Sequence, residues 1–208
     1  MQTSVVNKYH LNEEQLLICW QQFLDGEREA FGRLISFYYA ALFQYGMKMH
    51  ADKAFVQDCI QDMATHLWSR RERLSREVHV KSYLFKSLRH DMMRQLRRRQ
   101  LQAQHIIQWW KTDPHFDAEF SVETSIIDNE AAKEQRQRLH ESLQSLSPRQ
   151  QEIIYLRYYQ NMDHEQVAVI MKLQKEAVYN LLSAAIKRLK SHWGLAVALI
   201  ISLLSKFF

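Results

Sequence analysis

The scarcity of helix-breaking residues constrains the fold of this chain most strongly. Only 4 glycines and 2 prolines occur among its 208 residues. These two residue types most often end helices and form turns, so long uninterrupted elements are expected. Apolar residues recur every three or four positions over long stretches, and no sustained alternation of apolar and polar residues is seen, which is typical of amphipathic helices. The sequence therefore predicts an all-α protein.

Residues 12–100 are predicted to form one helical domain. Its helical patterns cover approximately residues 16–24, 31–45, 52–68 and 80–99. Gly26 follows the first pattern directly and is expected to end that helix as a C-cap residue.

Residues 101–129 differ in composition from the helical block that precedes them. The stretch from Lys111 to Glu130 gathers six carboxylates against a single lysine, and it holds Pro114, one of the two prolines. Such an acidic segment with a turn former is typical of a linker. We therefore expect two helical domains joined by an acidic linker.

Residues 130–191 are predicted to form a second helical domain, and its helix starts are clearly marked. Ser147 and Gln150 form the pattern of a capping box, with proline between them at the first helical position. Asp163 and Gln166 repeat the pattern. Asn161, which tolerates the left-handed conformation, is expected to end the intervening helix. Helices should therefore begin near residues 147, 163 and 175.

The last two of these helices are expected to pack as a crossed pair with a tight turn between them. Six residues of the second helix then face outward: Lys175, Glu176, Tyr179, Asn180, Ser183 and Lys187. Lysine, asparagine and serine can bond base edges or phosphates. The pattern alone leaves two interpretations open, a DNA-reading helix-turn-helix and a packed helical hairpin.

Several functional classes lack their sequence signals. Cys19 and Cys59 form no CxxC pair, and the ten histidines show no metal-ligand spacing. No glycine-rich phosphate loop or nucleophile elbow occurs. The two lone cysteines suit a reducing cytoplasm, which is the expected location, and the first fifteen residues show no secretory signal. A formal net charge of +5 is only weakly indicative of a polyanionic partner.

Ordered motifs in both domains resemble one known family. The C-terminal domain carries "LSPRQ" at 146–150, "LRYY" at 156–159 and "KRL" at 187–189, and the N-terminal domain carries "VQDCIQDMATHLW" at 56–68 and "KSYLFKSLRHDMMRQLRRR" at 81–99. In order and spacing these stretches resemble regions 4 and 2 of the extracytoplasmic-function sigma factors, within the bacterial sigma-70 family.

The resemblance implies a transcription initiation factor that binds core RNA polymerase and promoter DNA, without covalent chemistry, cofactor or metal. The residues implied in polymerase binding are Asp58, Gln61, Asp62 and Trp68. Those implied in promoter opening are Arg89, His90, Arg94, Arg97 and Arg98. The helix from Lys175, with the six outward residues named above, would read the upstream promoter element.

Physical chemistry agrees with a DNA-binding role for residues 70–99. Eleven arginines and lysines there outnumber three carboxylates, and such a patch neutralises phosphates and releases counterions. Tyr83 and Phe85 lie within this stretch. If their rings are exposed, both residues can stack on single-stranded bases. The alternative is that they are core residues, and this is the expected position for Phe85.

The chain departs from the family pattern at several positions. Lys172 stands where the turn usually carries glycine, and a left-handed lysine costs roughly 1 kcal/mol. His90 replaces the usual asparagine, and Arg94 the usual aspartate. Leu181 and Ala184 occupy recognition-helix positions that are often basic or polar in relatives. Contact with the upstream element is therefore expected to rest on few charges.

The apolar tail, residues 192–208, is expected to form a C-terminal helix. Even as one helix, residues 193–208 would measure about 24 Å, shorter than a bilayer core of roughly 30 Å. A helix docked on the domains and a contact with a partner or membrane surface are both compatible with the tail. It is also a candidate site for an anti-sigma factor, but its partner is unknown from the sequence.

Two other functions compete with that of a sigma factor. A helix-turn-helix regulator that acts without polymerase would share the C-terminal domain but would not need the helices at 56–99. A helical interaction protein that no longer binds DNA would fit the sparsely charged recognition helix and the apolar tail.

Overall fold

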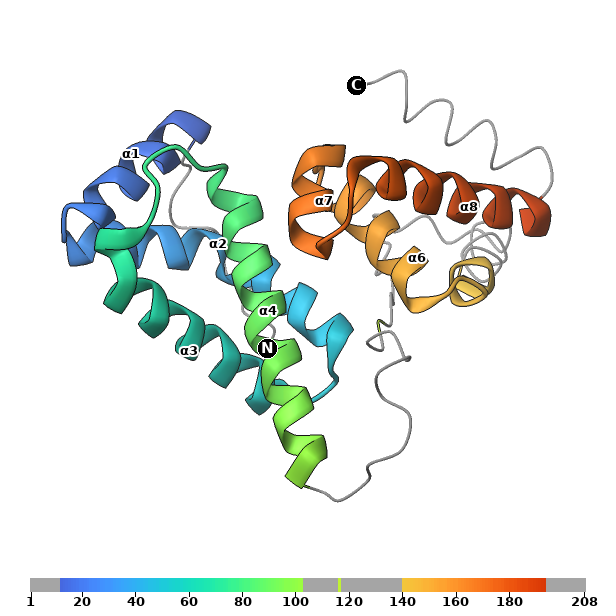
Figure 1. Ribbon diagram of the computed structural model, residues 1–208, viewed down its shortest axis with the longest axis horizontal. Helices are drawn as coiled ribbons and strands as arrows, with labels where there is room; N and C mark the ends of the chain where they lie inside the picture. The colour runs from blue at the N-terminus through green and yellow to red at the C-terminus, as the bar shows by residue number, and fades with distance from the viewer. Residues whose placement is uncertain (1–11, 103–115, 117–139, 194–208) are drawn as a thin grey trace, which may run out of the picture. The chain divides into compact units, whose positions relative to one another are not determined.

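The computed structural model describes residues 12–102, 116 and 140–193, and the chain divides into two compact units, residues 1–109 and 110–208 (Figure 1). Every regular element among the described residues is helical, which confirms the predicted all-α class. Most of the expected linker and nearly all of the apolar tail lie outside the described residues. The domain limits given above therefore stay predictions.

The described part of the N-terminal unit, residues 12–102, contains four α-helices and one short 3-10 turn. These are α1 (Glu13–Leu24), α2 (Arg28–Met49), α3 (Lys53–Arg70), η1 (Arg71–Arg73) and α4 (Val80–Gln102). Gly26 has the left-handed φ of 98° expected for its position after α1. The side chain of Asp52 caps α3 by accepting a hydrogen bond from the backbone N–H of Phe55. Asn12 and Gln15 form a capping box at the start of α1 that the sequence analysis had missed.

Large aromatic side chains fill the core of this unit. Trp20, Tyr45, Phe55 and Phe85 are all at most 1% exposed, and the burial of Phe85 confirms its expected core position. The indole Nε1 of Trp20 donates a hydrogen bond to the carbonyl oxygen of Ser75 at 3.0 Å. This bond ties the segment between η1 and α4 to α1.

At Gly46, α2 comes into close contact with both α3 and α4. A Cβ atom at this buried position would lie 2.5 Å from Cγ1 of Val56 in α3 and 3.4 Å from the sulfur of Met92 in α4. Because glycine has no side chain, α2 can pack against both helices at one point. No sequence signal in the chain had singled out this residue.

The C-terminal unit has the helix starts that the capping patterns predicted. Its elements are α6 (Pro148–Ile154), a π-helical turn η3 (Tyr155–Tyr159), α7 (His164–Met171) and α8 (Lys175–Trp193), and a short helical stretch at 140–144 precedes them. The capping boxes at Ser147 and at Asp163 are both formed. Phe116, from the expected linker, is buried in this unit with its ring 5.8 Å from that of Tyr155.

Two residues other than glycine adopt the left-handed conformation, both at helix ends of the described C-terminal unit. Asn161 has a φ of 51° and Lys172 a φ of 54°. Asparagine tolerates this region, whereas lysine is strained there by roughly 1 kcal/mol. The turn between α7 and α8 therefore keeps the geometry of a glycine turn without the glycine.

The search for membrane-spanning helices, made on the described residues alone, finds none that is both long enough and apolar enough.

We predict that Gly46→Ala destabilises the N-terminal unit by about 1–3 kcal/mol, because the new methyl group overlaps the side chain of Val56. Gly32→Ala, in the same helix but with no neighbouring atom within 4 Å of the added Cβ, should instead stabilise by about 0.5–1 kcal/mol. Urea unfolding of both variants measures the difference. Equal effects of the two substitutions would show that the close approach at residue 46 does not exist.

Candidate functional site

One face of α3 is polar and exposed along its whole middle. Asp58, Gln61 and Asp62 are exposed and spaced i, i+3 and i+4, so they lie on the same side of the helix. Cys59 and Met63, on the opposite side, are fully buried in the core. The structure therefore brings together three of the four residues implied in polymerase binding.

Trp68, the fourth of these residues, has a different setting at the end of α3. It is only half-buried, and its ring centroid lies 6.0 Å from that of Phe23 and 5.7 Å from that of Phe31. The guanidinium of Arg71 lies 4.9 Å from the centroid of the indole ring. Much of Trp68 therefore packs within the unit.

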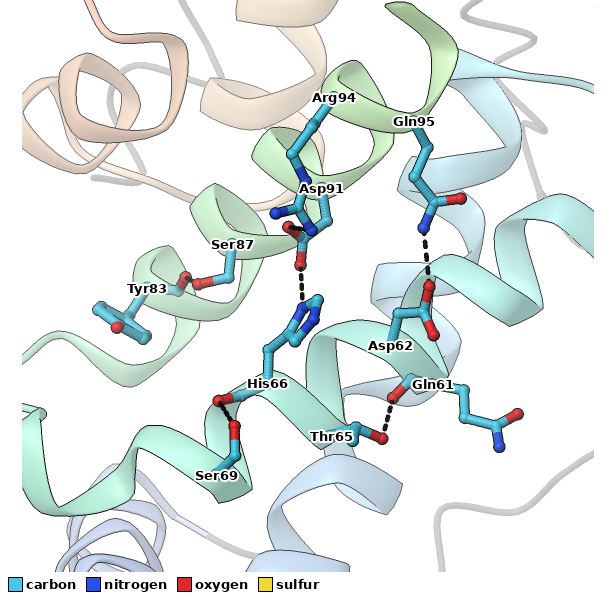
Figure 2. Close-up of polar contacts among 10 residues, drawn as sticks. All are labelled: Gln61, Asp62, Thr65, His66, Ser69, Tyr83, Ser87, Asp91, Arg94 and Gln95. Atoms are coloured by element: carbon cyan, nitrogen blue, oxygen red, sulfur yellow. Dashed lines mark hydrogen bonds and ion pairs between the residues drawn. The ribbon is translucent and has the colours of Figure 1, made fainter. Parts of the chain in front are cut away.

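Polar contacts join α3 to α4 at two levels, as Figure 2 shows. Nε2 of Gln95 donates a hydrogen bond to Oδ2 of Asp62 at 2.9 Å. One turn further along, Oδ2 of Asp91 lies 3.5 Å from Nδ1 of His66, and its Oδ1 lies 3.1 Å from Nη2 of Arg94. Asp91 is only 7% exposed. Its carboxylate is thus held between a residue of α3 and a residue of α4.

An exposed stripe of basic residues runs along one face of α4. His90, Arg94, Arg97 and Arg98 are all exposed, and their spacing of i, i+4, i+7 and i+8 places them on one face. Arg89 is only 9% exposed and lies outside this stripe. The structure therefore assembles four of the five residues implied in promoter opening, and it gives Arg94 a second contact at Asp91.

Other basic residues of this segment are engaged within the unit. Arg76 forms an ion pair with Asp25, and the guanidinium of Arg99 lies 4.3 Å from the ring centroid of Phe55. Burial lowers the pKa of Lys81. Only some of the basic residues in this segment are therefore available to bind a phosphate.

The side chain of Tyr83, near the start of α4, is partly exposed. Its ring lies 5.4 Å from that of Trp20 in an edge-to-face arrangement, and burial raises the pKa of its hydroxyl. The ring is therefore fixed in orientation but not enclosed. This placement is compatible with both the core and the base-stacking interpretation.

The outward face of α8 is arranged as the sequence predicted. All six of its expected residues, Lys175, Glu176, Tyr179, Asn180, Ser183 and Lys187, are exposed, whereas Val178, Leu182, Ala185 and Leu189 are buried.

Two of the six outward residues contact the start of α7. Nζ of Lys175 lies 2.6 Å from Oε1 of Glu165. The ring of Tyr179 stacks on that of His164 at a centroid distance of 4.3 Å. Burial, followed by the nearby charge of Arg157, lowers the pKa of His164 and favours its neutral form.

Neither cysteine is placed for thiolate chemistry. Both are buried, and desolvation raises the pKa of Cys59 to about 12. A search of the described residues for metal sites found no cluster of three or more histidine, cysteine or acidic side chains.

Four contact residues were missed by the sequence analysis. Asp91 and Gln95 bridge to α3 over separations of 25 and 33 residues, and no local pattern connects positions so far apart. His164 and Glu165 lie at the start of α7, only ten to fifteen residues before their partners. The expected crossed pair of helices was a usable signal for these two.

Comparison with known proteins places both units in one family. Residues 34–102 match the family model "Sigma-70 region 2", and residues 136–189 match "Sigma-70, region 4". A search of curated proteins gave no significant match.

Solved structures share the fold of the chain at low sequence identity. A structure of CnrH in complex with the cytosolic domain of CnrY aligns with a TM-score of 0.57 and 20% identity, over 85% of this chain and 96% of that chain. The sigma factor RpoE from Bartonella quintana, in complex with the anti-sigma factor NepR, aligns with a TM-score of 0.58 and 20% identity, over 81% of this chain and 99% of that chain.

We predict that Asp91→Asn lowers the free energy of unfolding of the N-terminal unit by about 1–2 kcal/mol, because it weakens charge-assisted contacts of a buried carboxylate. Asp62→Asn is the matched control, since Asp62 also bonds α4 but is exposed, and it should cost less than about 0.5 kcal/mol. Denaturant unfolding compares the two variants. A loss for Asp62→Asn as large as that for Asp91→Asn would contradict this assignment.

Proposed function

We propose that the two units of this chain, which belongs to the sigma-70 family, have separate roles in transcription initiation. The region 2 and region 4 matches occur in the family's order and together cover more than half of the chain. The chain is an alternative sigma factor that binds core RNA polymerase and directs promoter recognition. We assign it to the extracytoplasmic-function type on the sequence motifs of its regions 2 and 4.

The polar face of α3 is proposed to bind core polymerase. Its two carboxylates, Asp58 and Asp62, are exposed on the same side of the helix. A basic surface on the partner would be attracted and oriented by them. The hydrogen bond from Gln95 holds Asp62 in place without burying its charge.

The basic stripe of α4 is proposed to hold promoter DNA during opening. The observation that carries this assignment is the alignment of His90, Arg94, Arg97 and Arg98 on one exposed face. Such a row follows a phosphate backbone, and each neutralised phosphate releases counterions. Tyr83 is proposed to supply a partly exposed ring near this row for stacking on a base.

The outward face of α8 is proposed to enter the major groove at the upstream promoter element. This face offers few base-reading groups, because only Lys175, Asn180, Ser183 and Lys187 can donate hydrogen bonds through lysine, amide or aliphatic hydroxyl groups. Each good base contact discriminates by roughly 1–3 kcal/mol, so the total discrimination is small. Tethering through the polymerase raises the effective concentration of α8 at the promoter. Weak recognition of the base sequence by α8 is then sufficient for binding at the upstream promoter element.

The alternative of a regulator without polymerase is less well supported. Such a protein would not need a region 2, and the match over residues 34–102 is to that region. A protein that no longer binds DNA is disfavoured by the basic stripe of α4.

We further propose that the chain acts in the cytoplasm and is held inactive by an anti-sigma factor, as the complex of RpoE with NepR suggests. The sigma-70 family acts without enzymatic chemistry of its own. The transcription is carried out by the polymerase.

We predict that Asp58→Lys combined with Asp62→Lys weakens association with core polymerase, because like charges then face each other and slow the encounter. Gln95→Ala is the control, since it removes the hydrogen bond to Asp62 but keeps both carboxylates. Exposed helix positions of this kind usually change stability by less than about 0.5 kcal/mol, so the fold should survive. Wild-type core binding by the folded double variant would remove α3 from the interface.

We predict that Arg97→Ala combined with Arg98→Ala reduces promoter opening and flattens the salt dependence of DNA binding, by up to about one unit of slope per lost phosphate contact. Arg94 is left intact because it also contacts Asp91. Lys53→Ala with Arg33→Ala removes two charges elsewhere in the unit and serves as the control. Binding titrations over a range of salt give the slopes, and identical slopes for both double variants would exclude the stripe from the DNA contact.

We predict that Lys175→Ala combined with Asn180→Ala abolishes dependence on the upstream element and leaves core binding intact. Transcription from promoters with intact and scrambled upstream elements measures this dependence, with Lys190→Ala as a control on the same helix. Should the double variant distinguish the promoters as well as wild type does, α7 and α8 form only a packed hairpin.

A further inference from the structure

Lys175, the first residue of α8, is already bonded within the chain. Its Nζ lies 2.6 Å from Oε1 of Glu165, at the start of α7. The two side chains are 48% and 73% exposed, so the ion pair lies on the surface of the unit. The hydrogen bond to Glu165 and then the charge of Glu165 raise the pKa of Lys175, and both effects keep the ammonium charged and paired.

The ion pair lies on the face that is proposed to meet DNA, and the inference below rests on that proposed function. Lys187 is the other cation among the six outward residues, and the described part of the unit offers it no ion-pair partner. His164, next to Glu165, stacks on Tyr179 of the same face. Two adjacent residues of α7 thus engage two side chains of the first turns of α8.

A carboxylate and a phosphate are alternative acceptors for the same ammonium group. Phosphate oxygens accept charge-assisted hydrogen bonds as carboxylates do, and Lys175 can turn toward either because its stem is flexible. When DNA takes the ammonium, the carboxylate of Glu165 is left unpaired near the phosphate backbone. Both the lost ion pair and the remaining negative charge oppose binding.

We propose that Glu165 competes with DNA phosphate for the Lys175 ammonium and thereby lowers the affinity of the chain for DNA. An exposed ion pair of this kind is weak, so its removal should strengthen binding by at most about fivefold. The pair would keep α8 a poor DNA binder until polymerase tethers the chain at a promoter. Glu165 acts here through Lys175 and is a positioning residue.

The test uses the full chain and a labelled 30-base-pair duplex of random sequence, because phosphate contacts do not depend on sequence. Arg97→Ala and Arg98→Ala are included throughout to reduce the contribution of α4. Glu165→Gln, Lys175→Gln, their combination and Lys187→Gln are compared in this background by fluorescence anisotropy over a range of salt. Glu141→Gln provides the same loss of charge at an exposed site of the same unit.

Glu165→Gln is expected to tighten binding about two- to fivefold and to steepen the salt slope by up to about 0.9, as one more phosphate contact is made. The gain should vanish when Lys175→Gln is also present, and Glu141→Gln should give a smaller gain. Glu165→Gln should lower the thermal unfolding midpoint by no more than the loss of one weak surface ion pair allows, so the variant stays folded under the conditions of the binding assay.

Four results would overturn the proposal. Unchanged or weaker binding by Glu165→Gln shows that the carboxylate does not compete, and a gain that persists with Lys175→Gln shows general repulsion only. A gain equal to that of Glu141→Gln has the same meaning. If Lys187→Gln and Lys175→Gln both leave the affinity unchanged in every background, α8 does not contact DNA, and the proposed function of α8 fails with it.

Discussion

The architecture of the N-terminal unit depends on the point at which α2, α3 and α4 meet at Gly46. The missing side chain lets α2 approach Val56 of α3 and Met92 of α4 at once. Close packing leaves little room for adjustment, so this contact determines how α3 and α4 lie against each other. The polar bonds of Asp91 then fix the same two helices nearer the surface. One packing constraint thus positions both exposed faces, the carboxylates of α3 and the basic stripe of α4.

The local geometry decides which charges of this chain can act on a partner. Residues 70–99 are strongly basic in sequence, yet Arg89 is buried, and Arg76 is paired with Asp25. Arg97 and Arg98, near the end of α4, are exposed and available to a phosphate backbone, whereas the exposed Arg94 is also paired with Asp91. The same selection operates in the C-terminal unit, where Lys175 and Lys187 are both exposed but Lys175 is paired with Glu165. Counts of charge therefore overstate the electrostatic attraction that each surface can exert.

The sequence predicted what local chemistry determines and missed what distant contacts determine. Helix starts at Ser147 and Asp163 were correct because a capping box needs only four consecutive residues. The left-handed conformation of Lys172 was indicated only by the family resemblance, in which this turn position usually carries glycine. The exposure of the outward face of α8 followed from its apolar period. The burial of Arg89 and the contact of Gly46 with Val56 depend on how separate helices pack, and no pattern within one helix contains that information.

The central claim is that the two units act together on polymerase and promoter. Their family assignment rests on separate matches to residues 34–102 and 136–189, and the surfaces described above give each match a physical role. The most direct measurement is transcription in vitro with core RNA polymerase, the purified chain and a pool of genomic promoter fragments. The account predicts initiation at defined start sites only when the chain is present. Absence of specific initiation by a folded chain that still binds DNA would contradict it and would favour a regulator that acts without polymerase.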